Sequence, residues 1–221
     1  MPRRPATAAR KTAIQDRSKA TVDALLAATA RVLVREGYDR ASTNKIADAA
    51  GVSIGSLYQY FPSKEALVAA VIERHIDSMM DVVRNALVRV APLPIPEAAR
   101  ELVKVMIDAH RIEPKLHRVL VEQIPRVGNL EYIERVDEEA MALVRVYLEA
   151  HRDEIAVDDI DMASFICVMS VEAMTHAAVL RRPELLDNPR FIDEVAALVT
   201  RYVTTGAPPP SGISTTERAG R

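Results

Sequence analysis

Residues 53–60 have the sequence SIGSLYQY, which combines small residues with hydroxyl and amide groups. Side chains of this kind suit DNA recognition, in which phosphate contacts fix position and base contacts specify sequence. The small residues Ser53, Gly55 and Ser56 would let a helix approach a DNA groove closely. Tyr58 and Tyr60 could also be half-buried packing residues, and Lys64 a solvated surface charge. The groups that can reach phosphates or base edges are Tyr58, Gln59, Tyr60 and Lys64.

Two short helices joined by a tight turn are predicted to position these groups. The first is capped by Thr43, carries Ile46 inward and stops at Gly51, where the backbone must reverse in little space. The second is capped by Ser53 and broken at Pro62, because proline removes a hydrogen-bond donor. Such a pair cannot bury its apolar face alone, so a preceding helix must supply the third wall. This is helix-turn-helix architecture, whose second helix lies in the major groove.

The preceding helix is predicted to follow a basic arm. Residues 1–17 show no apolar period and are predicted to be flexible. Residues 1–20 carry six Lys and Arg but one acidic residue, so the arm either meets a polyanion or only adds solubility. A helix is predicted from residue 18 to Gly37, which ends it, because apolar residues recur about every 3.6 positions and so fall on one face. That face comprises Val22, Leu25, Leu26, Thr29, Val32 and Leu33.

Further helices are predicted to fill the rest of the chain. Ser63 caps a long helix whose apolar stripe runs from Leu67 to Leu87, before a proline-rich segment ends it. More helices are expected at residues 96–111, 114–124, 130–153, 159–181 and 191–202. The predicted fold class is all-α. Its parts are a flexible basic arm (1–17), a three-helix helix-turn-helix DNA-binding domain (18–64), a C-terminal helical ligand-binding and dimerisation domain (65–206), and a disordered tail (207–221).

Composition narrows the function classes. Seven glycines and 4% aromatic residues among 221 favour helices over a β design. The single cysteine, Cys167, excludes an intramolecular disulfide and a cysteine-based zinc site. No Gly-rich phosphate loop, Gly-x-Ser-x-Gly elbow or His-Glu-x-x-His helix occurs, so an enzyme is not indicated. With no apolar leader and no uncharged apolar run near roughly 18 residues, we expect a cytoplasmic protein without a membrane partner.

The histidines of the C-terminal half belong to different predicted helices. Metal ligands need clustered donors, so His110, His117, His151 and His176 are interpreted as structural or surface residues. Neither a metal nor a cofactor is expected. Glu172 and His176 lie one helical turn apart in an otherwise apolar helix. That pair is consistent with a dimer contact or with a polar anchor in a pocket.

Residues 24–71 carry a set of ordered, spaced matches to a known DNA-binding domain. They are Glu36-Gly37-Tyr38, Ser42-Thr43, Ile46-Ala47, Ala50-Gly51-Val52-Ser53, Gly55, Leu57-Tyr58, Tyr60-Phe61 and Lys64. On these residues the segment from about residue 18 to residue 67 resembles the DNA-binding domain of the tetracycline-repressor (TetR) family. Asn44 is a less usual choice for that family at the start of the second helix.

The resemblance implies an all-α homodimer that binds double-stranded operator DNA and is usually released by a ligand. A long helix would couple the DNA-binding domain to the ligand pocket. Gln59 is the best candidate for base readout, because its amide can pair bidentately with adenine. The other implied contacts are Thr43, Lys45 and Lys64 to phosphate, Ser53, Gly55 and Ser56 at the groove, and Tyr58 and Tyr60 to backbone or base.

An apolar pocket and a dimer interface are predicted in the C-terminal half. Residues 159–181 are apolar nearly all round, so they and the final helix, with Phe191, Val195, Leu198 and Tyr202, are expected to pair across a twofold axis. Ligand pockets are mostly apolar with a few placed polar groups, a make-up that a filled core shares. The predicted contacts to a small apolar or aromatic ligand are Met106, His110, Val121, Leu143, Tyr147, Phe165, Met169 and His176.

Three functions follow from these observations. A ligand-responsive repressor is favoured over a DNA-binding regulator without a ligand. A small-molecule carrier or catalyst that merely retains a helix-turn-helix is the third. Operator affinity separates the third from the other two, and ligand-induced release separates the first from the second.

Overall fold

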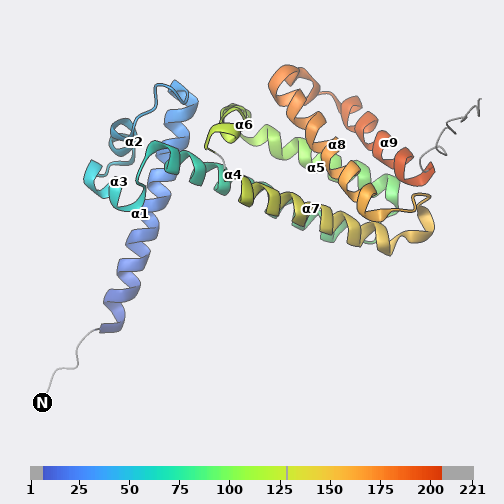
Figure 1. The fold of residues 1–221 in the computed structure, drawn as a ribbon, viewed down its shortest axis with the longest axis horizontal. Coiled ribbons are helices and arrows are strands. Elements are labelled where there is room, and N and C mark those ends of the chain that lie inside the picture. The colour runs from blue at the N-terminus through green and yellow to red at the C-terminus, as the bar shows by residue number, and fades with distance from the viewer. Residues whose placement is uncertain (1–6, 128, 206–221) are drawn as a thin grey trace, which may run out of the picture.

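Helices build the described structure. The computed structural model describes residues 7–127 and 129–205, and within them no strand occurs, which confirms the all-α class (Figure 1). Two short 3₁₀ helices, Arg152–Glu154 and Pro183–Leu185, flank α8. The α-helices are α1 (Thr7–Glu36), α2 (Thr43–Ala50), α3 (Ile54–Tyr60), α4 (Lys64–Val90), α5 (Ile95–Ile112), α6 (Pro114–Val127), α7 (Leu130–Ala150), α8 (Ile160–Arg181) and α9 (Pro189–Thr205).

Helices α1 to α3 and the start of α4 share one core. Ile46 of α2 and Leu57 of α3 are fully buried against the apolar face of α1. Ser53 and Ser63 cap α3 and α4 as predicted, but α2 is capped by Ser42 rather than Thr43. Ser42 has extended backbone and accepts from the N–H of Lys45, so Thr43 is already helical.

The turn after α2 depends on its glycine. Gly51 has φ 69°, a left-handed conformation that side chains with a Cβ rarely adopt. Its N–H returns to the carbonyls of Ala47 and Asp48, which closes α2 so that α3 can start three residues later. The predicted reversal at Gly51 is confirmed.

Helix α1 is longer than predicted. It starts at Thr7, so residues 7–17, predicted to be a flexible arm, are helical, while residues 1–6 lie outside the described residues. Residues 8–17, AARKTAIQDR, are mostly good helix formers, and extending an existing helix avoids the cost of nucleation. This end of α1 projects away from the other helices (Figure 1). A missing apolar period therefore does not exclude a helix.

Helix α4 leads from the core of α1 to α3 to the C-terminal helices, where α5 to α9 pack on one another (Figure 1). One core cluster joins α5, α8 and α9, and another joins α5, α7, α8 and α9. Helix α6 does not respect the predicted domain boundary at residue 64, because it packs on the helices before that boundary. Its Leu116 and Leu120 are buried in the core formed by α1 to α4, although α6 lies far along the chain.

Helix α8 is buried at some positions and exposed at others. By length and composition alone it could cross a membrane, but Ala163, Ala178 and Val179 are buried in the protein. Met162 and Phe165, near the start of the helix, are 57% and 53% exposed. Val195 of α9, predicted to belong to a dimer stripe, lies instead in the core against α5 and is only 3% exposed.

Candidate DNA-binding surface and ligand cavity

Helix α3 presents most of its surface to solvent. Only Leu57 is buried, and this anchor turns the rest of the helix outward. Tyr58 is 52% and Tyr60 36% exposed, so each packs partly on the protein and keeps part of its side chain in solvent. Ser53, Gly55 and Gln59 are exposed as well. The residues predicted to meet DNA on this helix therefore share one accessible element.

Two hydrogen bonds fix the start of this surface. Thr43 Oγ1 lies 3.1 Å from Tyr58 Oη, joining the first turn of α2 to α3. Ser53 Oγ accepts from the N–H of Ser56 at 3.1 Å. Ile54 is 39% exposed beside them, a residue that sequence reasoning missed because an isoleucine usually belongs to a core. An exposed apolar side chain at this position suits contact with a thymine methyl group.

The two predicted lysine contacts are engaged within the protein. Lys45 Nζ donates to the carboxylate of Glu36 and to the carbonyl of Arg40. Lys64 Nζ donates to the carbonyl of Tyr38 at 3.0 Å and lies 3.9 Å from the centre of its ring. A phosphate would have to share or replace these partners. Tertiary contacts of this kind leave no trace in local sequence.

Substitutions at Gly55 test whether α3 approaches DNA closely. A Cβ at this position would meet only Ser53 Oγ, at 3.9 Å, so the fold does not require glycine there. We expect Gly55→Ala to stabilise the chain by about 0.5–1 kcal/mol, since glycine weakens a helix. Gly55→Leu should fold but lose about 1–3 kcal/mol of operator binding, the scale of one good base contact. Thermal unfolding and DNA titration check both values; unchanged operator affinity in Gly55→Leu would place this helix face away from DNA.

A cavity of about 240 Å³ lies between α4, α5, α6, α7, α8 and α9. Its wall is mainly aliphatic, with Met79, Met80 and Met106 among the lining side chains. Met106, His110, Val121, Tyr147 and His176 were predicted to line a pocket, and all five do. The polar lining includes Tyr147, whose hydroxyl donates to the carbonyl of Leu93 at 2.7 Å.

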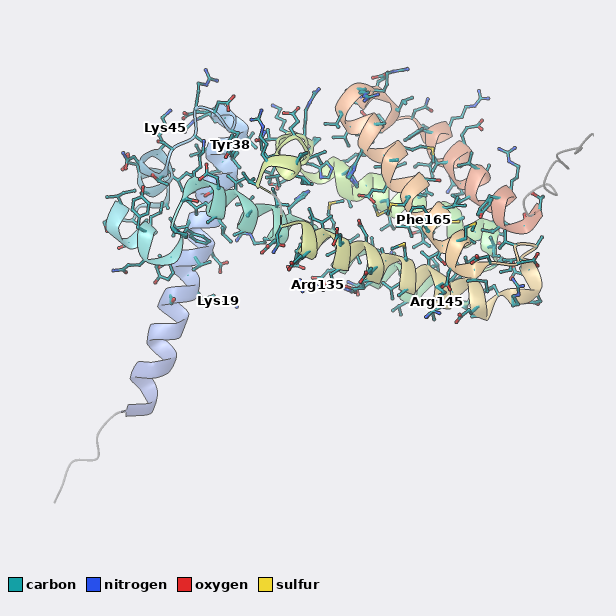
Figure 2. The ribbon with its side chains drawn as sticks, in the orientation of Figure 1. Lys19, Tyr38, Lys45, Arg135, Arg145 and Phe165 are labelled. Carbon is teal, nitrogen blue, oxygen red and sulfur yellow. The ribbon has the colours of Figure 1, made fainter. Side chains whose placement is uncertain are left out.

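Three predicted pocket residues, Leu143, Phe165 and Met169, do not line the cavity. Leu143 stands on α7, whereas Phe165, labelled in Figure 2 and 53% exposed, and Met169 stand on α8. On α8 the two share a face with Glu172 and His176, at helical spacings of three and four residues, and those two do line the cavity further along the helix. The prediction for α8 was therefore wrong in the position along the helix at which this face meets the cavity.

Four histidines meet at one end of the cavity. They come from α4, α5, α6 and α8, so the expectation of scattered histidines was wrong for all but His151, which stacks on Tyr147. The ring of His117 lies 4.3 Å from His110, 5.2 Å from His176 and 5.1 Å from His75, centroid to centroid. Burial lowers the pKa of His110 to about 4 and of His117 to about 2. Both imidazoles are therefore neutral at pH 7.

Two carboxyl groups face the same end of the cavity. Burial raises the pKa of Asp137 to about 6, helped by the charge of Glu172, and burial also raises the pKa of Glu172. Glu172 Oε1 lies 3.8 Å from His176 Nδ1, and both residues line the cavity. The pair left open between a dimer contact and a pocket anchor is therefore a pocket feature.

Two family profiles match the chain. Residues 25–71 match the family described as "Bacterial regulatory proteins, tetR family", and residues 94–202 match "Tetracyclin repressor-like, C-terminal domain". The chain belongs to the TetR family. TetR-family chains are DNA-binding transcriptional regulators, not enzymes. The predicted family and function class are confirmed.

Relatives of this TetR-family chain agree over short segments or in fold. The HTH-type transcriptional activator FasR of Mycolicibacterium smegmatis is 49% identical over 63 residues, 28% of this chain and 29% of that protein. The nucleoid occlusion factor SlmA of Haemophilus ducreyi is 51% identical over 39 residues, 18% of this chain and 19% of that protein. The chain thus spans less than a third of the length of either relative.

Solved structures share the fold of most of this TetR-family chain. The fatty acid degradation regulator FadR from Bacillus halodurans has a TM-score of 0.64 at 22% identity, covering 81% of this chain and 94% of that one. A TetR-family transcription regulator from Marinobacter aquaeolei has a TM-score of 0.64 at 19% identity, covering 86% and 98%. At such identities the likeness concerns fold alone.

Proposed function

We propose that this TetR-family regulator is a repressor that a small apolar or aromatic molecule, bound in the cavity, releases from its operator. The observation that carries the proposal is that Ile72 of α4 and Leu120 of α6 belong to two places at once. Both line the cavity, and both are 2% exposed in the core that holds the DNA-binding helices. A molecule that displaces these side chains therefore acts on the packing of α1 to α4.

The switch follows from differential binding. A ligand shifts a conformational equilibrium only if it prefers one state, here the state whose recognition helices are wrongly spaced for DNA. Well-packed cores change between discrete arrangements, so a small shift at α4 and α6 can reorient α3. A coupling of about 1–3 kcal/mol would change operator affinity some 5- to 150-fold, and DNA would weaken ligand binding by the same factor.

DNA contacts are proposed for the exposed part of the helix-turn-helix. Gln59 is the proposed base reader, with Ser53, Gly55 and Ser56 at the groove and Tyr58 and Tyr60 on backbone or bases. Thr43 positions Tyr58 through their shared hydrogen bond. Lys45 and Lys64 are proposed to meet phosphate at the expense of their bonds to Glu36, Arg40 and Tyr38. A regulator of this kind acts in the cytoplasm.

A homodimer is proposed through the open face of α8 and the adjoining edge of α9. Met162 and Phe165 of α8 are more than half exposed, and Leu198 of α9 is 48% exposed. Large exposed apolar side chains on two helices that pack on each other favour an interface there. Two copies of this helix pair would form a four-helix bundle across a twofold axis, which would present two recognition helices to two half-sites.

The repressor proposal is tested by filling the cavity. Apolar and aromatic compounds are screened for thermal stabilisation of the full chain, and each hit is titrated with and without operator DNA. We expect a hit to lose about 5- to 150-fold in affinity when operator is present. Ala140→Trp, in the cavity wall, should abolish the response but keep operator binding. Val146→Trp, on the same helix but 60% exposed and outside the cavity, is the matched control and should respond like the unchanged chain.

Two results would count against this proposal. A hit whose affinity ignores DNA would separate the cavity from the switch and favour a regulator without a ligand. A ligand that strengthens operator binding would reverse the proposed direction of the response.

A further inference from the structure

The histidine cluster holds donor atoms that the protein does not satisfy. His110 and His117 are 1% and 4% exposed, and the Nε2 atom of each has no hydrogen-bond partner among the described residues. Buried polar atoms are nearly always paired, because an unpaired one keeps its full desolvation cost. Two such atoms on neighbouring rings point to a missing partner common to both.

The hydrogen bonds of these rings decide what that partner is. His110 Nδ1 lies 2.6 Å from the carbonyl oxygen of Met106. A carbonyl only accepts, so Nδ1 carries the proton and Nε2 is a bare lone pair. His117 Nδ1 lies 2.8 Å from His75 Nε2, and when it donates there, His117 Nε2 is a bare lone pair as well. Two lone pairs cannot bond each other, but both can bond a cation.

We propose that His110, His117 and His176 form a binding site for a divalent transition-metal ion of the Zn²⁺ type. One donor atom from each residue lies within 4.8 Å of the other two. Zn–N bonds of about 2.0–2.1 Å in a tetrahedral site place donors about 3.3 Å apart, so small side-chain rotations would close the site. Three imidazoles with a fourth open position are a recognised zinc arrangement, and here that position opens to the cavity.

The surroundings supply the outer shell that such a site needs. Metal-bound histidines usually donate their other N–H to a carbonyl, a carboxylate or another acceptor, which orients the ring. The carbonyl of Met106 and the ring of His75 stand in those places for His110 and His117. Glu172 lies beside His176, with Oε1 3.8 Å from Nδ1, and the small rotations that close the site could bring it into that place. Asp137 and Glu172 line the same cavity, so two carboxyl groups stand close to the site.

The test is metal binding by the full chain, produced without a histidine tag and measured without DNA. Co²⁺ is titrated for the ligand-field absorption of a tetrahedral site, and Zn²⁺ affinity is measured in competition with a chelating indicator. We expect one ion per chain. His176→Gln, at a partly exposed position, should weaken Zn²⁺ binding by more than about 100-fold, beyond the roughly 10- to 100-fold expected for the outer-shell change His75→Ala.

His151→Gln is the matched control, because His151 lies outside the cluster, and it should bind Zn²⁺ like the unchanged chain. Circular dichroism without metal verifies that each variant is folded, and His117→Gln serves if His176→Gln is not. The proposal is overturned if the chain shows no saturable binding of one ion, or if His176→Gln and His151→Gln bind alike. Neither result touches the repressor proposal, which is measured with organic ligands and operator DNA.

Discussion

Phe165→Glu is expected to yield monomers that bind operator more than about 100-fold more weakly than the dimer, because one linked half-site contact is lost. Phe165 is 53% exposed on α8, so the glutamate side chain remains hydrated in the monomer and the fold survives. In the proposed dimer the same carboxylate would be buried without a partner, a cost that a few apolar contacts cannot offset. Analytical ultracentrifugation and DNA titration measure the two effects.

Substitutions at two valines serve as controls for Phe165→Glu. Val88→Glu changes a 77% exposed valine on α4 and should leave the dimer intact. Val195→Glu places a charge in the core beside Val103 and Ile107, so it should unfold the chain rather than dissociate it. A stable dimer in Phe165→Glu, and again in Leu198→Glu, would move the interface away from α8 and α9.

Leu57→Ala is expected to destabilise the helix-turn-helix domain by about 2–5 kcal/mol, the usual cost of deleting a buried leucine side chain. Leu57 is fully buried. Among residues 54–60, which the structure describes completely, it is the only buried residue of α3, so it anchors the helix. Loss of the anchor should release α3 and abolish operator binding at 37 °C. Urea unfolding measures the stability.

Gln59→Ala is the matched control on the same helix. Gln59 is exposed, so its removal should change stability by less than about 0.5 kcal/mol while relaxing sequence preference by about 1–3 kcal/mol. Equal destabilisation by the two changes would mean that α3 is not held through Leu57.

Local sequence determined the helices and the shape of the DNA-binding surface. The caps Ser53 and Ser63, the left-handed Gly51 and the inward Ile46 and Leu57 act within a few residues of where they stand. Caps, turns and 3.6 periodicity are local physics, and a short sequence window contains all of it. The same window named Tyr58, Gln59 and Tyr60 as groups able to reach DNA, and α3 exposes all three to solvent.

Tertiary structure alone decided which surfaces meet. Helix α8 is apolar on nearly all sides, so its sequence could not show that Phe165 is exposed and that Cys167 lines the cavity. The pairing of Lys45 with Glu36 and of Lys64 with Tyr38 depends on the approach of separate helices. Periodicity shows that a face is buried but carries no information about its partner.

The histidine cluster shows most clearly the difference between what local sequence determines and what tertiary structure decides. His75, His110, His117 and His176 stand on four helices, and each alone is an ordinary histidine in its sequence window. They meet because α6 packs into the core of α1 to α4 through Leu116 and Leu120, which turns His117 toward the others. That packing rests on contacts between residues far apart in the chain. The sequence supplied the donor atoms, and the packing of four helices brought them within reach of one ion.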